Sequence, residues 1–196
     1  MQKRFRLTLG DIFEVPLPNG RKGFIQYLGK DYWGDMVGIY AYITDTDKKV
    51  DLDELKNIKF KFKPLVTRIR QGMKLSEYPK YFEKLKSMGT TFRPEIQKLL
   101  QEPHTACDWK RIGNINVENF AYPNFIWKEG AFEYRDQITK WYLFNGKENV
   151  LLGKRLPREY KNLEYHSSLP PLSIVDFILH GTDKNRKTHL EMIHKG

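Results

Sequence analysis

The first third of the chain alternates apolar and polar positions in the way that is typical of β-strands. One face of the segment Gly10–Leu17 is entirely apolar, because it carries Phe13, Val15 and Leu17. The next three residues, Pro18–Asn19–Gly20, are a strong turn signal, since Asn and Gly tolerate a positive φ. Further strands are predicted at Gly23–Leu28 and Met36–Ile43. The pattern therefore predicts a hairpin that continues into a small antiparallel sheet.

The segment Ile58–Lys63 has the strictest alternation in the sequence. Its apolar residues occupy every second position and are separated by Lys59, Lys61 and Lys63. We interpret it as a strand with its lysines facing outward, where they would also protect a sheet edge from mispairing. Val66–Arg70 continues in a similar way. Several strands within about sixty residues predict an SH3-like small barrel or a bent antiparallel sheet.

The rest of the chain predicts short helices followed by a second sheet. Helices are expected at Asp51–Asn57, Ser76–Met88 and Pro94–Gln101, and at Ser173–Leu179 with Ser173 as N-cap and Gly181 as its end. Strands are expected at Ile112–Phe120 and Asn124–Trp127, with a hairpin at Lys140–Gly153 and a loop or helical turn at Leu156–Tyr160. The fold class is therefore α+β, mostly β. We divide it into a subdomain 1–75 and a second part 76–196, which can also form one continuous domain.

The composition is that of a soluble globular protein, with 40% hydrophobic and 30% charged residues. A single cysteine, Cys107, excludes a disulfide within the chain and is interpreted as a buried apolar residue. The basic N-terminus lacks the apolar core of a signal peptide, and no stretch has the length of a membrane span. We expect a cytoplasmic protein.

The formal charge of +10 is unevenly distributed. Between Lys56 and Lys98 there are twelve Lys or Arg residues and only three Asp or Glu residues. Such an excess favours acidic partners, although it is also compatible with a solvated surface.

The sequence contains no recognisable catalytic motif. The five histidines have no metal-ligand spacing, and no nucleophile elbow, phosphate-binding loop or dinucleotide fingerprint occurs. Distant residues can still converge on a metal, and the best candidates are His166 and His180 with Asp108 or Asp176. We expect neither a cofactor nor an enzymatic activity.

A binding surface has better support. The cationic side chains of the predicted strand region can contact phosphates or an acidic protein. The two aromatic residues on the preceding loop can stack on a base. The predicted partner-binding residues are Tyr32, Trp33, Lys59, Lys61, Lys63, Arg68 and Arg70.

The opening segment resembles the immunity protein 26 family. Members of this family start with a strand and turn of the type GDxFxxPLxxG followed by a glycine-bearing strand, which here correspond to Gly10–Gly20 and Gly23–Leu28. Later features agree in order: Trp109 with Gly113, Trp141–Leu143, Leu152–Gly153 before Leu156–Tyr160, and a closing helix at Ile174–Val175.

This resemblance implies a bacterial immunity protein that binds and neutralises a cognate toxin in the cytoplasm. Because this chain is strongly basic, we expect a toxin with an acidic surface, or a contact through the acidic stretch Asp45–Glu54. The alternatives are a nucleic-acid-binding protein that uses the basic strand face and a small metal-dependent hydrolase. The hydrolase alternative is implied by the resemblance, because an organophosphate triester hydrolase has been classified under similar family names.

Overall fold

A computed structural model describes ten segments of the 196-residue chain. The described residues are 5–31, 33–77, 83–84, 87, 92–99, 107–117, 127–134, 137–144, 148–165 and 168–182.

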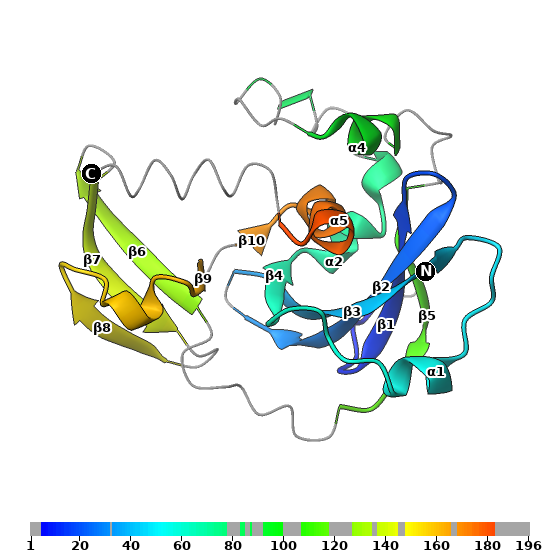
Figure 1. Cartoon of the computed structure of the whole chain (residues 1–196), viewed down its shortest axis with the longest axis horizontal. Coiled ribbons are helices and arrows are strands. Elements are labelled where there is room, and N and C mark those ends of the chain that lie inside the picture. Colours follow the sequence, from blue (N-terminus) through cyan, green and yellow to red (C-terminus); the bar gives the residue numbers. More distant parts are fainter. Residues whose placement is uncertain are drawn as a thin grey trace.

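The first sheet has six strands in the order β10-β4-β3-β2-β1-β5 (Figure 1). Its strands are β1 (Asp11–Leu17), β2 (Arg21–Lys30), β3 (Asp35–Asp45), β4 (Leu65–Thr67), β5 (Lys110–Asn114) and β10 (Ser168–Leu169). Neighbouring strands run antiparallel, except that β10 lies parallel to β4. The outermost strands thus come from parts of the sequence far from the central hairpin.

The N-terminal hairpin is confirmed. β1 and β2 pair from Ile12↔Gln26 to Leu17↔Arg21. In the turn between them, Asn19 and Gly20 have φ values of 63° and 66°. This left-handed backbone is what the Asn-Gly signal predicted.

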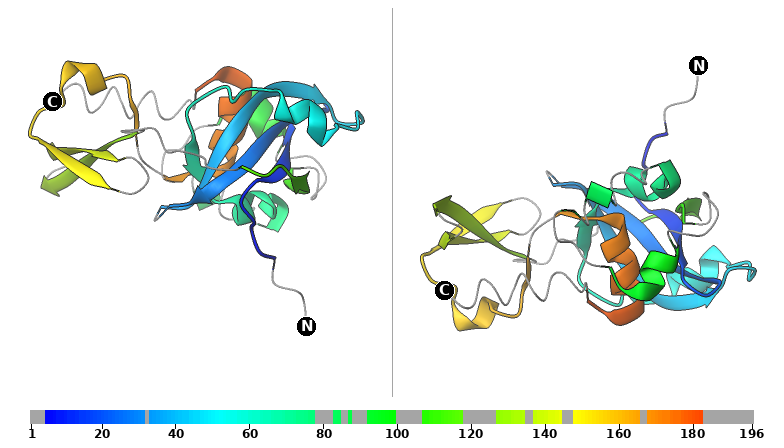
Figure 2. Two further views of the ribbon diagram at one scale, coloured as in Figure 1. Left: turned by 90° about the horizontal axis from the view of Figure 1, so that it is seen from below. Right: turned by 90° about the horizontal axis from the view of Figure 1, so that it is seen from above.

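Both faces of the first sheet are covered. On one face, Phe13, Val15 and Ile39 belong to a core cluster with residues of α2 (Ile69–Gly72), α4 (Pro94–Leu99) and α5 (Pro171–His180). On the other face, Ile12 and Tyr40 pack with Leu55 of α1 (Leu52–Lys56). Figures 1 and 2 show α5 lying across the sheet. The remaining short helices are η1 (Leu75–Glu77) and η2 (Arg158–Tyr160).

The second sheet has four strands in the order β8-β7-β6-β9 and lies to one side of the first sheet (Figure 2). Its strands are β6 (Trp127–Tyr134), β7 (Gln137–Phe144), β8 (Asn149–Gly153) and β9 (Glu164–Tyr165). β7 and β8 form the predicted hairpin, although its Asn145–Gly146 turn lies outside the described residues. Phe144 packs with Leu28 and Val66 of the first sheet, so the two sheets are in contact.

The α+β class with two sheets and short helices is confirmed. Among the described residues the first sheet is open, so the predicted SH3-like barrel is not closed. The division of the chain near residue 75 stays a prediction.

The predicted strand at Ile58–Lys63 is wrong. Phe60 forms only an isolated bridge with Tyr40, flanked by the bonds Ala41 N–H to Lys59 O (3.1 Å) and Lys61 N–H to Ile39 O (2.7 Å). The lysines are exposed and the apolar residues half-buried, as the alternation predicted. The segment pairs with β3 at this single bridge, and the chain then bends at residues 61–63 before β4 begins. It therefore does not form the consecutive pairs of a β-strand.

Other boundaries also differ. The predicted strand Val66–Arg70 is β4 followed by α2, and β5 ends at Asn114 rather than continuing through Val117. The last helix begins at Pro171 after Pro170 as N-cap, so Ser173 lies in its buried first turn, while Gly181 ends it with a φ of 76°. Proline suits the first position because its missing N–H would have no partner there.

Two further predicted elements lie mostly outside the described residues. Of Ser76–Met88, the structure describes η1 and the helical residues 83, 84 and 87, and the remainder lies outside the described residues. Of Asn124–Trp127, only Trp127 is described, at the start of β6.

Candidate functional site

Two hollows on the first sheet are lined by four of the predicted binding residues, Trp33, Lys59, Arg68 and Arg70. The first, which we call the basic hollow, has a volume of about 590 Å³. It is lined by the chain start, the β2–β3 loop and the segment around α2, with Arg6, Leu7, Tyr27, Lys30, Asp31, Trp33, Gly34, Asp35, Arg68, Arg70 and Gln71. Residues from three separate parts of the sequence therefore form one surface.

A tight turn positions Trp33 beside this hollow. The Trp33 N–H donates to Asp31 Oδ1 (2.8 Å), and the Asp31 N–H donates to Gly34 O (2.9 Å). Gly34 lies so close to β4 that a Cβ there would be 2.4 Å from Thr67 O. The side chain of Trp33 is 42% exposed, which is unusual for such a large aromatic group.

Asp35 fixes the position of α2. Its carboxylate is buried at the start of β3 and accepts the Ile69 N–H at 3.0 Å. Burial raises the pKa of Asp35, and the Ile69 N–H together with the charges of Lys30, Arg70 and Arg68 opposes that rise. This hydrogen bond holds Ile69 against β3, and the neighbouring Arg68 and Arg70 both line the basic hollow.

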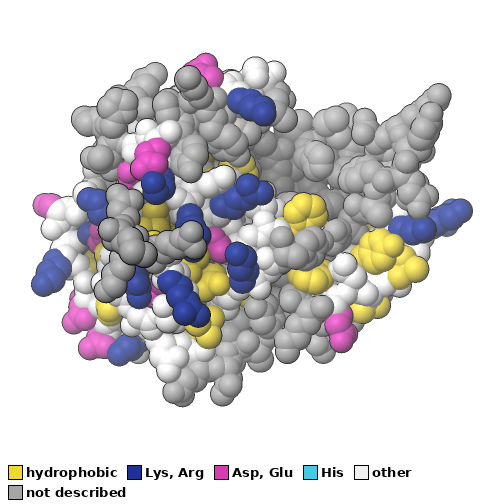
Figure 3. All heavy atoms as spheres, turned by 180° about the vertical axis from the view of Figure 1, so that it is seen from behind, with side chains coloured by type: hydrophobic (Ala, Val, Ile, Leu, Met, Phe, Trp, Pro, Cys, Tyr) yellow, Lys and Arg dark blue, Asp and Glu magenta, His cyan; other side chains and the backbone are white. Residues whose placement is uncertain are grey.

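The cations of the basic hollow lie outside and its carboxylates inside. Arg6, Lys30, Arg68 and Arg70 are exposed, whereas Asp31 and Asp35 are buried and accept backbone N–H groups. Arg70 Nη2 also donates to Phe5 O at 3.0 Å and so holds the chain start in place. Figure 3 shows Lys and Arg side chains gathered over the first sheet. A partner approaching this surface meets positive charge.

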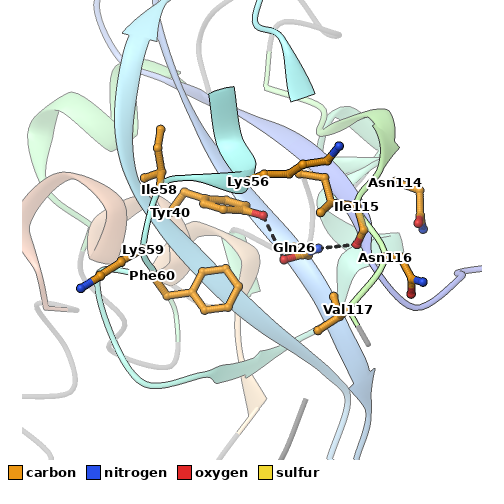
Figure 4. Close-up of a pocket in the computed structure, with 10 residues that line it drawn as sticks. All are labelled: Gln26, Tyr40, Lys56, Ile58, Lys59, Phe60, Asn114, Ile115, Asn116 and Val117. Carbon is orange, nitrogen blue, oxygen red and sulfur yellow. Dashed lines mark hydrogen bonds between the residues drawn. The ribbon is translucent and has the colours of Figure 1, made fainter. Parts of the chain in front are cut away.

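The second hollow, which we call the polar hollow, has a volume of about 660 Å³ (Figure 4). The Tyr40 hydroxyl donates to Gln26 Oε1 (2.9 Å), and Gln26 Nε2 donates to Ile115 O (2.8 Å). Its lining residues are Gln26, Tyr40, Lys56, Ile58, Lys59, Phe60, Asn114, Ile115, Asn116 and Val117. Burial raises the pKa of Tyr40 to about 12, so its hydroxyl stays protonated at neutral pH. The Tyr40–Gln26 pair therefore ties β3 to β2 and to the chain after β5.

The structure brings together only some of the predicted binding residues. Trp33, Arg68 and Arg70 all line the basic hollow, whereas Lys59 lines the polar hollow. Lys61 Nζ instead donates to Ile178 O (3.0 Å) near the end of α5 and lies 5.3 Å from the centre of the Phe62 ring.

Lys63 is exposed and belongs to neither lining, and Tyr32 lies outside the described residues. Lys59, Lys61 and Lys63 therefore do not share the lining of one hollow, and their role in binding stays a prediction. Arg6 and Lys30 also line the basic hollow but were not among the predicted binding residues, because neither has a local sequence signal that distinguishes it from other exposed cations.

The proposed metal ligands do not form a cluster in the described part of the chain, where no group of three or more His, Cys, Asp or Glu side chains is arranged to hold a metal ion. Asp176 pairs with Arg93 (2.7 Å), and His180 contacts Glu95 (2.9 Å). Asp108 accepts both the N–H and the hydroxyl of Ser76. His166 lies outside the described residues.

Cys107 is buried, as predicted. Of the helices that the structure describes, none has both the length and the apolar character to cross a membrane.

Comparison with known proteins gives one match. No curated protein and no solved structure matches this chain significantly. The family model described as Immunity protein 26 matches residues 8–87, which include β1 to β4, α1, α2 and most of the lining of the basic hollow. The prediction from the opening motif is thus confirmed: residues 8–87 of this chain match the immunity protein 26 family, and that family implies an immunity protein against a bacterial toxin.

Proposed function

We propose that this chain protects its producing cell by binding a cognate toxin in the cytoplasm, as a stoichiometric inhibitor without catalysis of its own. The observation that carries the proposal is the immunity protein 26 match over residues 8–87. That segment contains the strands and short helices whose exposed cations and exposed Trp33 are suited to a protein partner.

The chemistry of the buried polar groups supports binding rather than catalysis. Titratable groups with shifted pKa values often mark catalytic sites, but Asp35 and Tyr40 have structural explanations. Asp35 holds the start of α2, and Tyr40 holds Gln26. Burial is the largest cause of both shifts.

The charge of the chain constrains the toxin. A protein of net charge +10 associates slowly and weakly with a basic surface, because like charges repel at long range. Toxins that cleave nucleic acids are often basic themselves, since they must hold phosphates. We therefore expect a toxin that presents an acidic surface to this chain.

Co-expression with the toxin domain encoded beside this chain tests the proposal. We expect a 1:1 complex by size-exclusion chromatography with light scattering, and survival of cells that express both proteins. A neighbouring product that is not toxic, or a toxin that neither binds this chain nor is neutralised by it, would refute the proposed function. Turnover of the toxin by substoichiometric amounts of this chain would refute the non-catalytic mechanism.

A further inference from the structure

The basic hollow combines two kinds of side chain that dominate protein interfaces. Trp and Arg are, with Tyr, the residues most enriched among interface positions with large energetic effects. Here Trp33 is 42% exposed and lies in the same hollow as Arg68 and Arg70. Lys30 and Arg6 add two more exposed cations to the lining.

We propose that the basic hollow docks an acidic loop of the toxin, with Trp33 as the apolar anchor and Arg68 and Arg70 as the partners of the loop's carboxylates. The proposal rests on the proposed function. Arginine is suited to this role because its planar guanidinium donates two parallel hydrogen bonds to one carboxylate.

Much of the hollow is already held in place before a partner arrives. The turn at Asp31 fixes Trp33, the Asp35–Ile69 bond fixes the start of α2, and Arg70 holds the backbone of Phe5. Fixed elements lose little conformational entropy on binding, so more of the contact energy appears as affinity.

The arrangement of charges favours a short acidic peptide segment over nucleic acid. A nucleic-acid backbone needs a continuous track of cations, but Lys59 and Lys61 lie at other places on the sheet and Lys61 is bonded to α5. Asp31 and Asp35 in the wall of the hollow also interrupt the row of cations, so the lining offers no continuous track for a run of phosphates. A single loop with two or three carboxylates is short enough to contact Arg68 and Arg70 and needs no further cations.

Charge reversal tests the assignment in the toxin complex. We expect Arg68→Glu/Arg70→Glu to weaken binding by at least about 100-fold, because it places like charges against the loop. The matched control Lys59→Glu/Lys63→Glu changes the net charge equally on exposed side chains outside the basic hollow, and we expect it to weaken binding less than about 5-fold. Thermal unfolding verifies that each variant is folded, and Arg68→Gln/Arg70→Gln with Trp33→Ala repeats the test without adding acidic groups beside Asp35. Equal losses for the two charge reversals would overturn the assigned surface while leaving the proposed function intact.

A second experiment needs no toxin. Hexaglutamate is titrated into the ¹⁵N-labelled protein at low salt, and the Trp33 indole N–H is assigned with Trp33→Phe. We expect this resonance and the Arg68 and Arg70 side-chain resonances to shift together and to saturate, and Arg68→Gln/Arg70→Gln to abolish the shift. Shifts confined to the Lys59 and Lys63 region would refute the proposal. So would tighter binding of a hexathymidylate oligonucleotide than of hexaglutamate, which would identify the hollow as a nucleic-acid site.

Discussion

The two hollows of the first sheet have similar volumes but differ in what their polar groups do. In the polar hollow, the Tyr40 hydroxyl and the Gln26 amide bond to each other and to the backbone of Ile115. In the basic hollow, the buried carboxylates bond to the backbone, and the cations around them face solvent. One hollow uses its hydrogen bonds to join strands, whereas the other presents its cations to solvent.

Volume alone therefore does not distinguish the two hollows, whereas the bonding of their polar groups does. The larger hollow is the one whose central polar groups already have partners within the protein. The smaller one gathers exposed Arg and Trp side chains, which carry binding energy in protein complexes. Substitutions that affect only stability at one hollow and binding at the other can test this distinction.

The largest effect is expected from Gly72→Ala at the end of α2. A Cβ at Gly72 would lie 2.3 Å from the ring of Trp109, which is buried and cannot move aside. We expect a loss of about 3 kcal/mol in the free energy of unfolding, measured by urea denaturation, because overpacking a core costs about 1–3 kcal/mol. α2 should shift and weaken toxin binding as well. A variant as stable as the parent would show that α2 is not held against Trp109.

Tyr40→Phe should have the next largest effect and should act on stability alone. It removes the hydroxyl that donates to Gln26 Oε1 in a buried site, so we expect a loss of about 2 kcal/mol. Affinity for the toxin should not change. Tyr42→Phe is the matched control, because the Tyr42 hydroxyl pairs with the exposed Lys48 and its loss should cost less than about 0.5 kcal/mol. Loss of toxin binding in Tyr40→Phe would assign the polar hollow to the interface.

Gly38→Ala at the polar hollow should cost less than Gly72→Ala. The added Cβ would lie 2.5 Å from the Phe60 ring, but Phe60 is half-buried on an irregular segment and its ring faces the hollow. The ring can turn toward the open space, so we expect a loss of about 1 kcal/mol in the same urea experiment. A loss equal to that of Gly72→Ala would mean that the wall of the polar hollow is as rigid as the core under α2.

Asp35→Asn should produce a smaller change, visible mainly in the pH dependence of stability. Because burial raises the pKa of Asp35 above its ordinary value of 3.8, the folded protein holds this proton to higher pH than the unfolded chain. Stability from this group is therefore greatest below pH 3.8 and declines as the pH rises through the folded pKa. Asn keeps an acceptor for the Ile69 N–H and removes the decline, so the Tm profile between pH 3 and 7 should flatten.

Arg70→Gln should change the same profile in the other direction. The Arg70 charge opposes the rise in the pKa of Asp35, so its removal should raise that pKa further and extend the decline to higher pH. NMR titration of the Asp35 carboxyl measures this shift directly. A pKa of Asp35 at or below 3.8 in the parent protein would contradict the account of both variants.

The sequence predicted the central strands because their signals are local. Phe13, Val15 and Leu17 recur at every second position and are all buried, and Asn19–Gly20 adopts the left-handed backbone that the hairpin turn uses. The alternation at Ile58–Lys63 predicted the exposure of each side chain correctly but not a strand. A strand also needs a neighbour along its whole length, and this segment meets β3 only at the Tyr40–Phe60 bridge.

The basic hollow was predicted only in part for a related reason. Trp33, Arg68 and Arg70 were identified by residue type and by the charge of their region. Their meeting depends on the Asp35–Ile69 bond, and the contribution of Arg6 depends on the path of the chain start past Arg70. Such long-range contacts leave no periodic signal in one sequence.

The two outer strands of the first sheet, β5 and β10, come late in the sequence, so they are the last strands of that sheet to be translated. β5 covers the edge of β1, β10 covers the edge of β4, and α5 fills the core next to Val15. When residues 8–87 have left the ribosome, β5, β10 and α5 have not yet been synthesised. The edges of β1 and β4 are then unpaired, and the apolar face next to Val15 is exposed. Translation must continue through Ile178 before that surface is closed. A nonsense mutation shortly before Pro171 would spare every residue of the basic hollow and still expose the apolar face that α5 covers, which favours aggregation.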